Sequence, residues 1–257
     1  MCHMPSVCKA TRSHGLPFCE AADHSSFYFL PSTSMPVSKA SSQGLACLAL
    51  LVASHFPAWA ADVKAGANIA ANGGAQGAPA CVSCHGSKGE GGPGFPPLAG
   101  QSAGYLERQL HTLAAGKRKA ITMAPVARAL SDQEKADVAA YYASLKLPIE
   151  SKVGALPKAK DSNGAWLVER GRWADGIPAC AKCHGPGGTG VGMDFPAIGH
   201  LDAKYMQTQM AAWRKQERDA GPLGLMGSIA QKLTDQDVQD VADYYQQMHQ
   251  GAKPASN

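Results

Sequence analysis

Two short segments of the chain combine cysteine and histidine at a spacing that suits one chemistry. They read Cys81-Val82-Ser83-Cys84-His85 and Cys180-Ala181-Lys182-Cys183-His184. Two thiols about one helical turn apart can add to the two vinyl groups on one edge of a porphyrin, and the histidine that follows can bind the iron. This spacing is the attachment signature of a c-type haem. The sequence therefore predicts two covalently bound haem c groups.

Four cysteine thiols are predicted to attach the two haems. Two histidine imidazoles are predicted to bind the two irons. The thiols are Cys81, Cys84, Cys180 and Cys183, and the imidazoles are His85 and His184. A zinc site with four thiolates is the alternative. It would require the four cysteines to converge across residues 81–183, and it would leave both histidines without a role.

The ligand on the opposite face of each iron decides between an electron carrier and a catalyst. A second protein ligand closes the metal to substrate, whereas an open position allows oxygen or peroxide chemistry. Met123 follows His85 by 38 residues, and Met226 follows His184 by 42 residues. Each stands seven residues before the leucine that precedes the last predicted helix of its half. We therefore predict Met123 and Met226 as the second iron ligands, with core packing as the alternative role.

Other residues compete for this role with weaker support. Met193 lies in a glycine-rich loop of the second half and has no counterpart in the first. His111 and His200 would give bis-histidine ligation, but neither has a histidine at the matching position of the other half. Met206 and Met210 fall on an apolar helical stripe, which favours a core position.

The two halves of the chain repeat one another beyond the haem motifs. The offset is 99 residues at the motif histidines and 103 residues at a tyrosine pair near the end of each half. Such an internal repeat indicates two copies of one structural unit. The matched residues are His85 with His184, Phe95 with Phe195, Tyr105 with Tyr205, Gln109 with Gln209, Met123 with Met226, and Tyr141-Tyr142 with Tyr244-Tyr245.

Helical signals recur in the same order in both halves. Apolar residues at helical spacing predict helices over residues 62–72 and 102–115, and a capping box at Ser131 and Glu134 opens another. The second half predicts helices over residues 163–174, after Asp202, and after Thr234. The fold class is therefore all-α, with two tandem domains that each form a small helical fold around a covalent haem c.

Three further features have more than one interpretation. Phe95-Pro96 and Phe195-Pro196 force extended backbone, which could cover a haem face and exclude water or serve as an ordinary anchored loop. Lys117-Arg118-Lys119 could steer an acidic partner, clamp a haem propionate or be a solvated charge run. Three tryptophans unique to the second half are interpreted as core or interdomain packing; they are Trp166, Trp173 and Trp213.

The N-terminal region resembles an export signal. Met35-Pro36-Val37-Ser38-Lys39 precedes an apolar run over residues 45–54 and then Ala58-Trp59-Ala60. This order predicts a signal peptide over residues 35–60, cleaved after Ala60, with a retained membrane anchor as the alternative. Residues 1–34 are predicted to be a misassigned or disordered start.

The mature chain then divides into a first cytochrome domain over residues 61–147, a linker over residues 148–162 and a second domain over residues 163–257. Because covalent haem attachment of this kind takes place outside the cytoplasm, the predicted location is the periplasm. The other four cysteines precede residue 60, so no structural disulfide is expected in the mature chain. The formal net charge of +4 is mild, and the sequence lacks the concentrated basic face of a nucleic-acid-binding protein.

The residues of the first half resemble those of dihaem cytochromes c4. The second half is similar, but it carries Gly199-His200 where the family usually has Ala-Gly, and a longer methionine segment ending at Met226. The segments that carry the resemblance are Cys81-Val82-Ser83-Cys84-His85-Gly86, Phe95-Pro96-Pro97-Leu98-Ala99-Gly100-Gln101, Tyr105, Gln109-Leu110, Met123-Ala124-Pro125 and Leu130-Ser131-Asp132 through Ala140-Tyr141-Tyr142.

The resemblance implies two class I domains related by a pseudo-twofold axis, with haem propionates meeting near the interface between them. It implies a periplasmic electron carrier, a monomer or dimer often loosely associated with the membrane, that shuttles electrons between respiratory donors and a terminal oxidase or reductase. The donor would be a quinol–cytochrome c reductase or a dehydrogenase. One alternative is a cytochrome c subunit of a periplasmic dehydrogenase complex. The less favoured alternative is a dihaem enzyme, such as a peroxidase or a thiosulfate-oxidising protein.

Overall fold

The structure is a computed structural model that describes residues 60–146, 162–221 and 223–249. The predictions for the start segment, for the signal peptide up to residue 59 and for most of the linker lie outside these ranges. Within them, none of the helices is long and apolar enough to cross a membrane.

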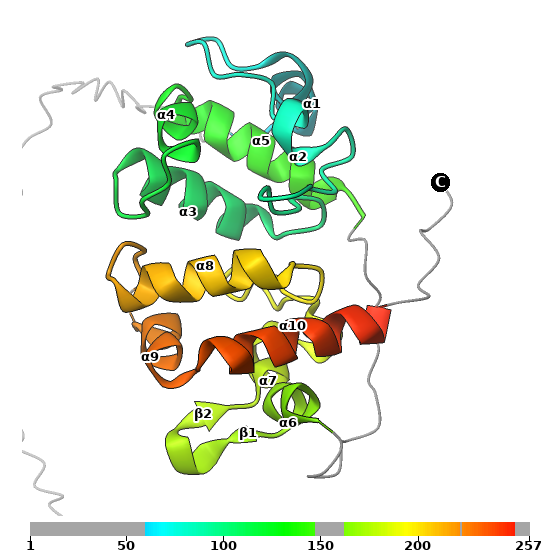
Figure 1. The fold of residues 1–257 in the computed structure, drawn as a ribbon. Coiled ribbons are helices and arrows are strands. Elements are labelled where there is room, and N and C mark those ends of the chain that lie inside the picture. The colour runs from blue at the N-terminus through cyan, green and yellow to red at the C-terminus, as the bar shows by residue number, and fades with distance from the viewer. Residues whose placement is uncertain (1–59, 147–161, 222, 250–257) are drawn as a thin grey trace, which may run out of the picture. The chain divides into compact units, whose positions relative to one another are not determined.

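Five helices make up the described part of the first half (Figure 1). Helices α1 and α5 pack against each other, and α5 also contacts α3, which in turn contacts α4. The helices are α1 (Val63–Asn72), α2 (Val82–His85), α3 (Ala103–Ala114), α4 (Met123–Arg128) and α5 (Asp132–Ser144).

The second half repeats this order of helices with some short additions. A small antiparallel hairpin and a 3₁₀ turn follow its first helix. The elements are α6 (Asn163–Glu169), β1 (Gly171–Arg172), η1 (Trp173–Asp175), β2 (Ile177–Pro178), α7 (Cys180–His184), η2 (Pro186–Gly188), α8 (Ala203–Arg214), α9 (Leu225–Lys232) and α10 (Asp235–His249). The two-domain, mostly helical fold predicted from the sequence is thus confirmed.

Side-chain caps set the starts of three helices of the first half, α1, α3 and α5, and the capping box of α5 was predicted from the sequence. The Asp62 carboxylate accepts hydrogen bonds from the second and third backbone amides of α1, and the Ser102 hydroxyl accepts from Tyr105 N at the start of α3. Ser131 and Glu134 form a reciprocal capping box at α5. These short-range contacts satisfy amide groups that a helix leaves unpaired at its N-terminus.

Glycine allows the first and last helices of each half to cross closely. A Cβ atom added at Gly66 in α1 would lie 2.0 Å from the carbonyl oxygen of Asp137 in α5. At Gly164 in α6 the same atom would lie 2.0 Å from the carbonyl oxygen of Asp240 in α10. Any side chain at either position would therefore force the helices apart, which explains why the two positions share one residue type.

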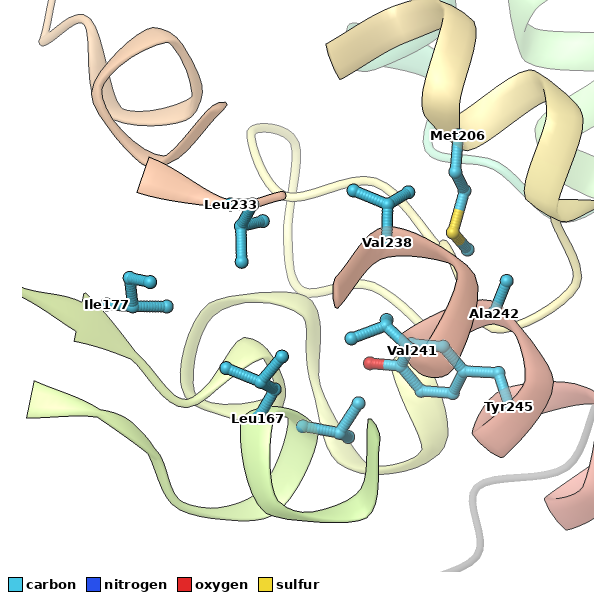
Figure 2. Close-up of a cluster of buried hydrophobic side chains, with 9 residues drawn as sticks. Leu167, Ile177, Met206, Leu233, Val238, Val241, Ala242 and Tyr245 are labelled. Atoms are coloured by element: carbon cyan, nitrogen blue, oxygen red, sulfur yellow. The ribbon is translucent and has the colours of Figure 1, made fainter. Parts of the chain in front are cut away.

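Each half has its own apolar core. In the first half Leu106, Val138 and Tyr142 are buried together, and Cys81 packs against their cluster. In the second half the corresponding cluster joins helices α6, α8 and α10 to strand β2 (Figure 2). Met206 is buried in this cluster and Met210 packs against it, as the helical stripe predicted.

The prediction of one helix over residues 163–174 was wrong in its second part. Helix α6 ends at Glu169, and the chain then forms the β1–β2 hairpin. Gly171 adopts φ +75°, and a Cβ atom there would lie 2.5 Å from the backbone of both Ile177 and Ala179. The hairpin therefore requires glycine at this position. The prediction that Trp173 is packed was also wrong, because this residue on the hairpin is 67% exposed.

Candidate haem sites

The predicted iron-binding histidines end two short helices, α2 and α7. Cys81 precedes α2 and Cys84 lies within it, whereas Cys180 and Cys183 both lie in α7. One helical turn thus carries both thiols of a motif and its histidine. His85 is 4% exposed and His184 is 7% exposed, so both imidazoles enter the interior of their halves.

A backbone carbonyl fixes the orientation of each imidazole. Nδ1 of His85 lies 2.8 Å from the carbonyl oxygen of Pro96, and Nδ1 of His184 lies 2.8 Å from that of Pro196. Since a carbonyl oxygen can only accept, Nδ1 must carry the proton, which leaves Nε2 with a free lone pair. Burial lowers the pKa of both histidines, and this further favours the neutral, metal-binding form.

The aromatic residue of each Phe-Pro pair also contacts the histidine. The ring of Phe95 meets His85 edge-on at a centroid distance of 6.0 Å, and Phe195 meets His184 at 6.3 Å. The repeated Phe-Pro pair therefore supports the iron ligand through a ring contact and a carbonyl acceptor. The sequence singled out these prolines for their effect on the backbone, not as acceptors. Only their similar spacing from the motif histidines could have suggested this role.

The buried end of His85 fits an iron ligand. Nε2 of His85 is buried without a hydrogen-bond partner within the described part of the chain. An orphaned nitrogen of this kind is costly unless another group binds it. The hydroxyls of Tyr142 and Tyr245 are likewise buried without partners among the described residues, each on the last helix of its half. A haem held at Cys81 and Cys84 would bring its iron to the free lone pair of His85.

The cysteines suit thioether bonds better than a thiolate zinc site. Burial raises the pKa of the Cys81 thiol, and it raises that of Cys180 to about 12. A zinc site needs ionised thiolates, whereas a thioether is neutral and tolerates an apolar setting. In the described ranges no group of three or more His, Cys, Asp or Glu side chains is arranged to hold a metal ion.

The two predicted methionine ligands lie on short helices rather than in loops. Met123 is the first residue of α4, and Met226 is the second residue of α9. Both are half-buried, and α4 and α9 pack against α3 and α8 respectively. The two methionines therefore occupy equivalent positions in the two halves. Their bonds to iron stay a prediction.

The competing ligands lie in different settings. The Met193 side chain is 63% exposed, and its backbone oxygen accepts hydrogen bonds from Ser102 and Arg108 of the first half. His111 lies on the surface of α3, 3.7 Å from carboxylate oxygens of Glu107 and Asp132. These contacts hold Met193 and His111 at the surface beside α3, so neither side chain is buried in the interior with a motif histidine.

His200 is the one predicted alternative whose ring nitrogens are both buried and unpartnered among the described residues. Burial, with a contribution from nearby His249, lowers the pKa of His200 to about 4. The residue is therefore neutral at physiological pH. Its counterpart in the first half is Gly100, so it has no equivalent across the repeat.

Comparison with known proteins decides what these paired sites are. The model of the cytochrome c family matches residues 63–146 and 172–249. The chain belongs to the cytochrome c family. Each matched segment contains one complete set of predicted ligands, so this cytochrome binds two covalent haem c groups. A bound haem supplies a one-electron Fe(III)/Fe(II) couple.

Relatives place the protein among the dihaem, c4-like cytochromes. The thiosulfate dehydrogenase electron acceptor of Stutzerimonas stutzeri is 42% identical over 204 residues, which are 78% of this chain and 92% of that one. The structure of reduced cytochrome c4 from Pseudomonas stutzeri superposes with a TM-score of 0.61 at 34% identity, covering 73% of this chain and 98% of that one. The chain is a dihaem electron-transfer protein.

A thiosulfate dehydrogenase structure from Marichromatium purpuratum gives a TM-score of 0.62 at 34% identity. The match covers 71% of this chain but only 39% of that longer one. The dihaem cytochrome therefore corresponds to one part of that protein.

Proposed function

We propose that this cytochrome is an exported electron carrier that accepts electrons from a thiosulfate dehydrogenase and passes them to a terminal oxidase or reductase. The observation that carries the proposal is the repeated site. His85 and His184 are oriented by the same carbonyl contact, and Met123 and Met226 occupy equivalent helix starts. The name of the Stutzerimonas stutzeri relative supplies the class of donor.

The role of carrier rather than enzyme follows from this arrangement. If Met123 and Met226 each fill the second axial position, neither iron has a site for substrate. The thioether of methionine also favours the reduced iron and raises the reduction potential. Both effects suit a protein that only receives and donates electrons, and the relatives named above are themselves electron-transfer cytochromes.

The donor assignment is tested by mixing the oxidised cytochrome with a purified thiosulfate dehydrogenase and thiosulfate. We expect rapid appearance of the reduced haem spectrum, faster than with thiosulfate alone. The rate should fall at higher ionic strength if charged surfaces steer the encounter. Reduction no faster than the control without dehydrogenase would refute the donor assignment.

A permanent dehydrogenase subunit is the second candidate. It is supported by the thiosulfate dehydrogenase structure, of which this fold makes up only a part. The two candidates differ in the lifetime of the complex, because a carrier uses a small and transient interface. Purification from the native organism distinguishes them: a single cytochrome at the mass of the mature chain supports the carrier, and stable co-purification with a dehydrogenase supports the subunit.

The proposed location is the periplasm, after cleavage at Ala60. The support is the order of charged, apolar and small residues before this position, together with the covalent haem. N-terminal sequencing of the haem-containing protein from a periplasmic extract should begin at Ala61. A haem-containing chain that still begins before residue 45 would contradict cleavage.

A further inference from the structure

Two histidines of the second half have no histidine at the matching positions of the first. His200 corresponds to Gly100, and the offset of 103 residues at the tyrosine pair makes Lys146 the counterpart of His249. His249 is the last residue of α10, and His200 lies in the loop before α8. The haem sites, which both halves share, therefore do not require either histidine.

Both histidines are held against one dipeptide, Gly187-Gly188, in the loop that follows the second haem motif. Nε2 of His249 lies 2.9 Å from the carbonyl oxygen of Gly187. The carbonyl oxygen of Gly188 accepts a hydrogen bond at 3.0 Å from the amide of Gly199, the residue before His200. A positive charge on His249 lowers the pKa of His200, so the two imidazoles lie close enough to interact.

The backbone around the two histidines is closely packed. A Cβ atom at Gly188 would lie 2.7 Å from the amide nitrogen of Gly199 and 2.9 Å from a ring carbon of Tyr245. Tyr245 precedes His249 by about one turn of α10. The end of this helix and the two loops therefore support one another, which positions both imidazoles before any ligand binds.

Three ring nitrogens of the two histidines are buried without hydrogen-bond partners among the described residues. They are Nδ1 of His249 and both nitrogens of His200. Because a carbonyl oxygen can only accept, Nε2 of a neutral His249 carries the proton and Nδ1 has a free lone pair. Burial is the chief cause that lowers the pKa of His200 to about 4, so this imidazole is neutral near pH 7 and also has a free lone pair. Buried nitrogens of this kind are costly unless another group binds them.

The donor set indicates the class of ligand. A metal-binding histidine usually donates its other ring N–H to a carbonyl or carboxylate oxygen, as His249 does to Gly187. In the described ranges no third His, Cys, Asp or Glu side chain completes a metal-binding group. Structural zinc takes four ligands and Ca²⁺ takes six or more oxygens, so two imidazoles suit neither ion. Monovalent copper binds imidazole, accepts two ligands in a linear arrangement, and carries a single charge, which costs least to bury.

We propose that His200 and His249 form a binding site for one monovalent copper ion, with Nδ1 of His249 and one ring nitrogen of His200 as the ligands. The bound ion would join the end of α10 to the loop after the second haem motif and to the loop before α8. It would satisfy the buried nitrogens and stabilise the folded second half. The site uses no predicted haem ligand and does not depend on the proposed electron donor.

The test is equilibrium dialysis of the purified dihaem protein against Cu(I), with the bound copper counted by mass spectrometry. Ascorbate keeps both the copper and the haems reduced, so that no electron passes between them. His200→Gly and His249→Lys introduce the residue types that the first half carries at these positions. We expect the wild type to bind one copper ion more than either variant, with an affinity for this ion at least about tenfold higher. Equal copper binding in the wild type and both variants would overturn the proposal.

Two comparisons make the result specific. His111→Gln removes a histidine on the surface of α3 beside two carboxylates, and it should bind copper as the wild type does. Loss of the same copper ion in this control would show that the binding is not specific to the proposed pair and would overturn the proposal. Zn²⁺ in place of Cu(I) should show no binding that His200→Gly removes. Zinc binding at this site would overturn the assignment to monovalent copper.

The variants must fold for this comparison to hold, and their visible haem spectra report whether they do. His200→Gln and His249→Gln replace the first two variants if the residue types of the first half prevent folding. Glutamine keeps a polar side chain at each position but removes the imidazole, so the same loss of copper is expected.

A spectroscopic readout identifies the ligands directly. The reduced protein is labelled with nitrogen-15 at histidine and titrated with Ag(I), which has the charge and ligand preference of Cu(I) but no accessible redox step. The ring-nitrogen resonances of His200 and His249 should shift together, and those of His111 should not. Unchanged resonances for either His200 or His249 would contradict the proposed ligand pair.

Copper should also stabilise the fold by mass action. At a free copper concentration about 100 times the dissociation constant, the apparent equilibrium constant for unfolding should fall about 100-fold in the wild type and stay unchanged in His200→Gly. A wild-type unfolding curve that copper does not move would contradict binding to the folded state. All of these measurements use the cytochrome alone, so failure of this proposal and failure of the proposed donor are independent results.

Discussion

Asp237 at the start of α10 connects three parts of the second half through one carboxylate. Its oxygens accept hydrogen bonds from Arg172 Nη1 at 2.7 Å and Nη2 at 3.0 Å, from Asn163 Nδ2 at 3.0 Å and from the amide of Thr234 at 2.9 Å. The Asp237 side chain is only 6% exposed. We predict that Asp237→Asn strongly destabilises the second half, because the new amide group cannot accept two of these bonds and removes the charge.

The size of the loss in the free energy of unfolding follows from the hydrogen bonds that Asp237→Asn removes. The substituted side chain would keep one oxygen, so the bonds made by Arg172 Nη2 and Thr234 N, both to Oδ2, would lose their acceptor. A hydrogen bond to a charged group contributes about 1.5–3 kcal/mol. The Arg172 side chain is 31% exposed, so water can replace part of the hydrogen bonding that it loses. We therefore expect the free energy of unfolding to fall by about 2–3 kcal/mol.

Asp137 in α5 is the matched control in the first half. It is equally buried, but both of its side-chain hydrogen bonds, from Asp62 N and Gln133 Nε2, use the same oxygen, Oδ1. An amide side chain at this position can keep that oxygen as its carbonyl. Asp137→Asn should therefore lower the free energy of unfolding by less than about 1 kcal/mol.

The assay is urea unfolding of the haem-containing protein, followed by far-ultraviolet circular dichroism. Urea is preferred because guanidinium chloride is a salt and screens ion pairs. The pKa of Asp237 is lowered chiefly by the hydrogen bonds from Arg172, so its contribution is complete above the unfolded pKa of about 4 and is lost as the pH falls toward the lowered folded value. The gap between wild type and Asp237→Asn should narrow below about pH 4. A gap equal to that of the Asp137 control, or one independent of pH, would refute the reasoning.

Two further predictions concern ligation and the hairpin. Met123→Ala and Met226→Ala should each leave one iron without its second ligand, so that carbon monoxide changes the reduced spectrum of half the haem. If carbon monoxide does not change the spectrum of a variant, the substituted methionine is not a ligand. Gly171→Ala should lower the free energy of unfolding by about 2–4 kcal/mol, because the new Cβ atom would clash with the backbone and the positive φ is unfavourable for alanine. Gly77 has a similar φ of +85° but open space around it, so Gly77→Ala should lower the free energy of unfolding by only about 1 kcal/mol. Equal losses in thermal or urea unfolding would show that the clash at Gly171 is relieved.

The features that could be predicted best from the sequence depend on residues that lie close together in the chain. The capping box at Ser131 and the helix start after Thr234 were predicted because the groups that cap each helix lie three residues apart. The haem motifs were predicted for the same reason, since one turn of helix carries all three reactive groups. Repetition also singled out Met123 and Met226 as candidate ligands, because a residue present in both copies stands out from the other methionines. Their bonds to iron stay a prediction.

Features that depend on distant contacts were missed. Arg118 and Arg218, from different halves, pair in an antiparallel bridge, and no local pattern shows this contact or the burial of Arg218. The carbonyl of Pro96 acts through the backbone, which its side chain does not reveal. The hairpin that begins at Gly171 was taken for helix, because a local helical pattern does not report the close approach of Ala179.

The central claim is that both irons are held between a histidine and a methionine and only transfer electrons. The most direct measurement is the visible spectrum of the matured protein, oxidised and reduced, with and without carbon monoxide, with haems counted by pyridine haemochrome on the same sample. We predict two haems per chain, a methionine-to-Fe(III) charge-transfer band in the far red, and no response to carbon monoxide. Rapid binding of carbon monoxide at either haem of the wild-type protein would contradict this claim and would favour an enzyme.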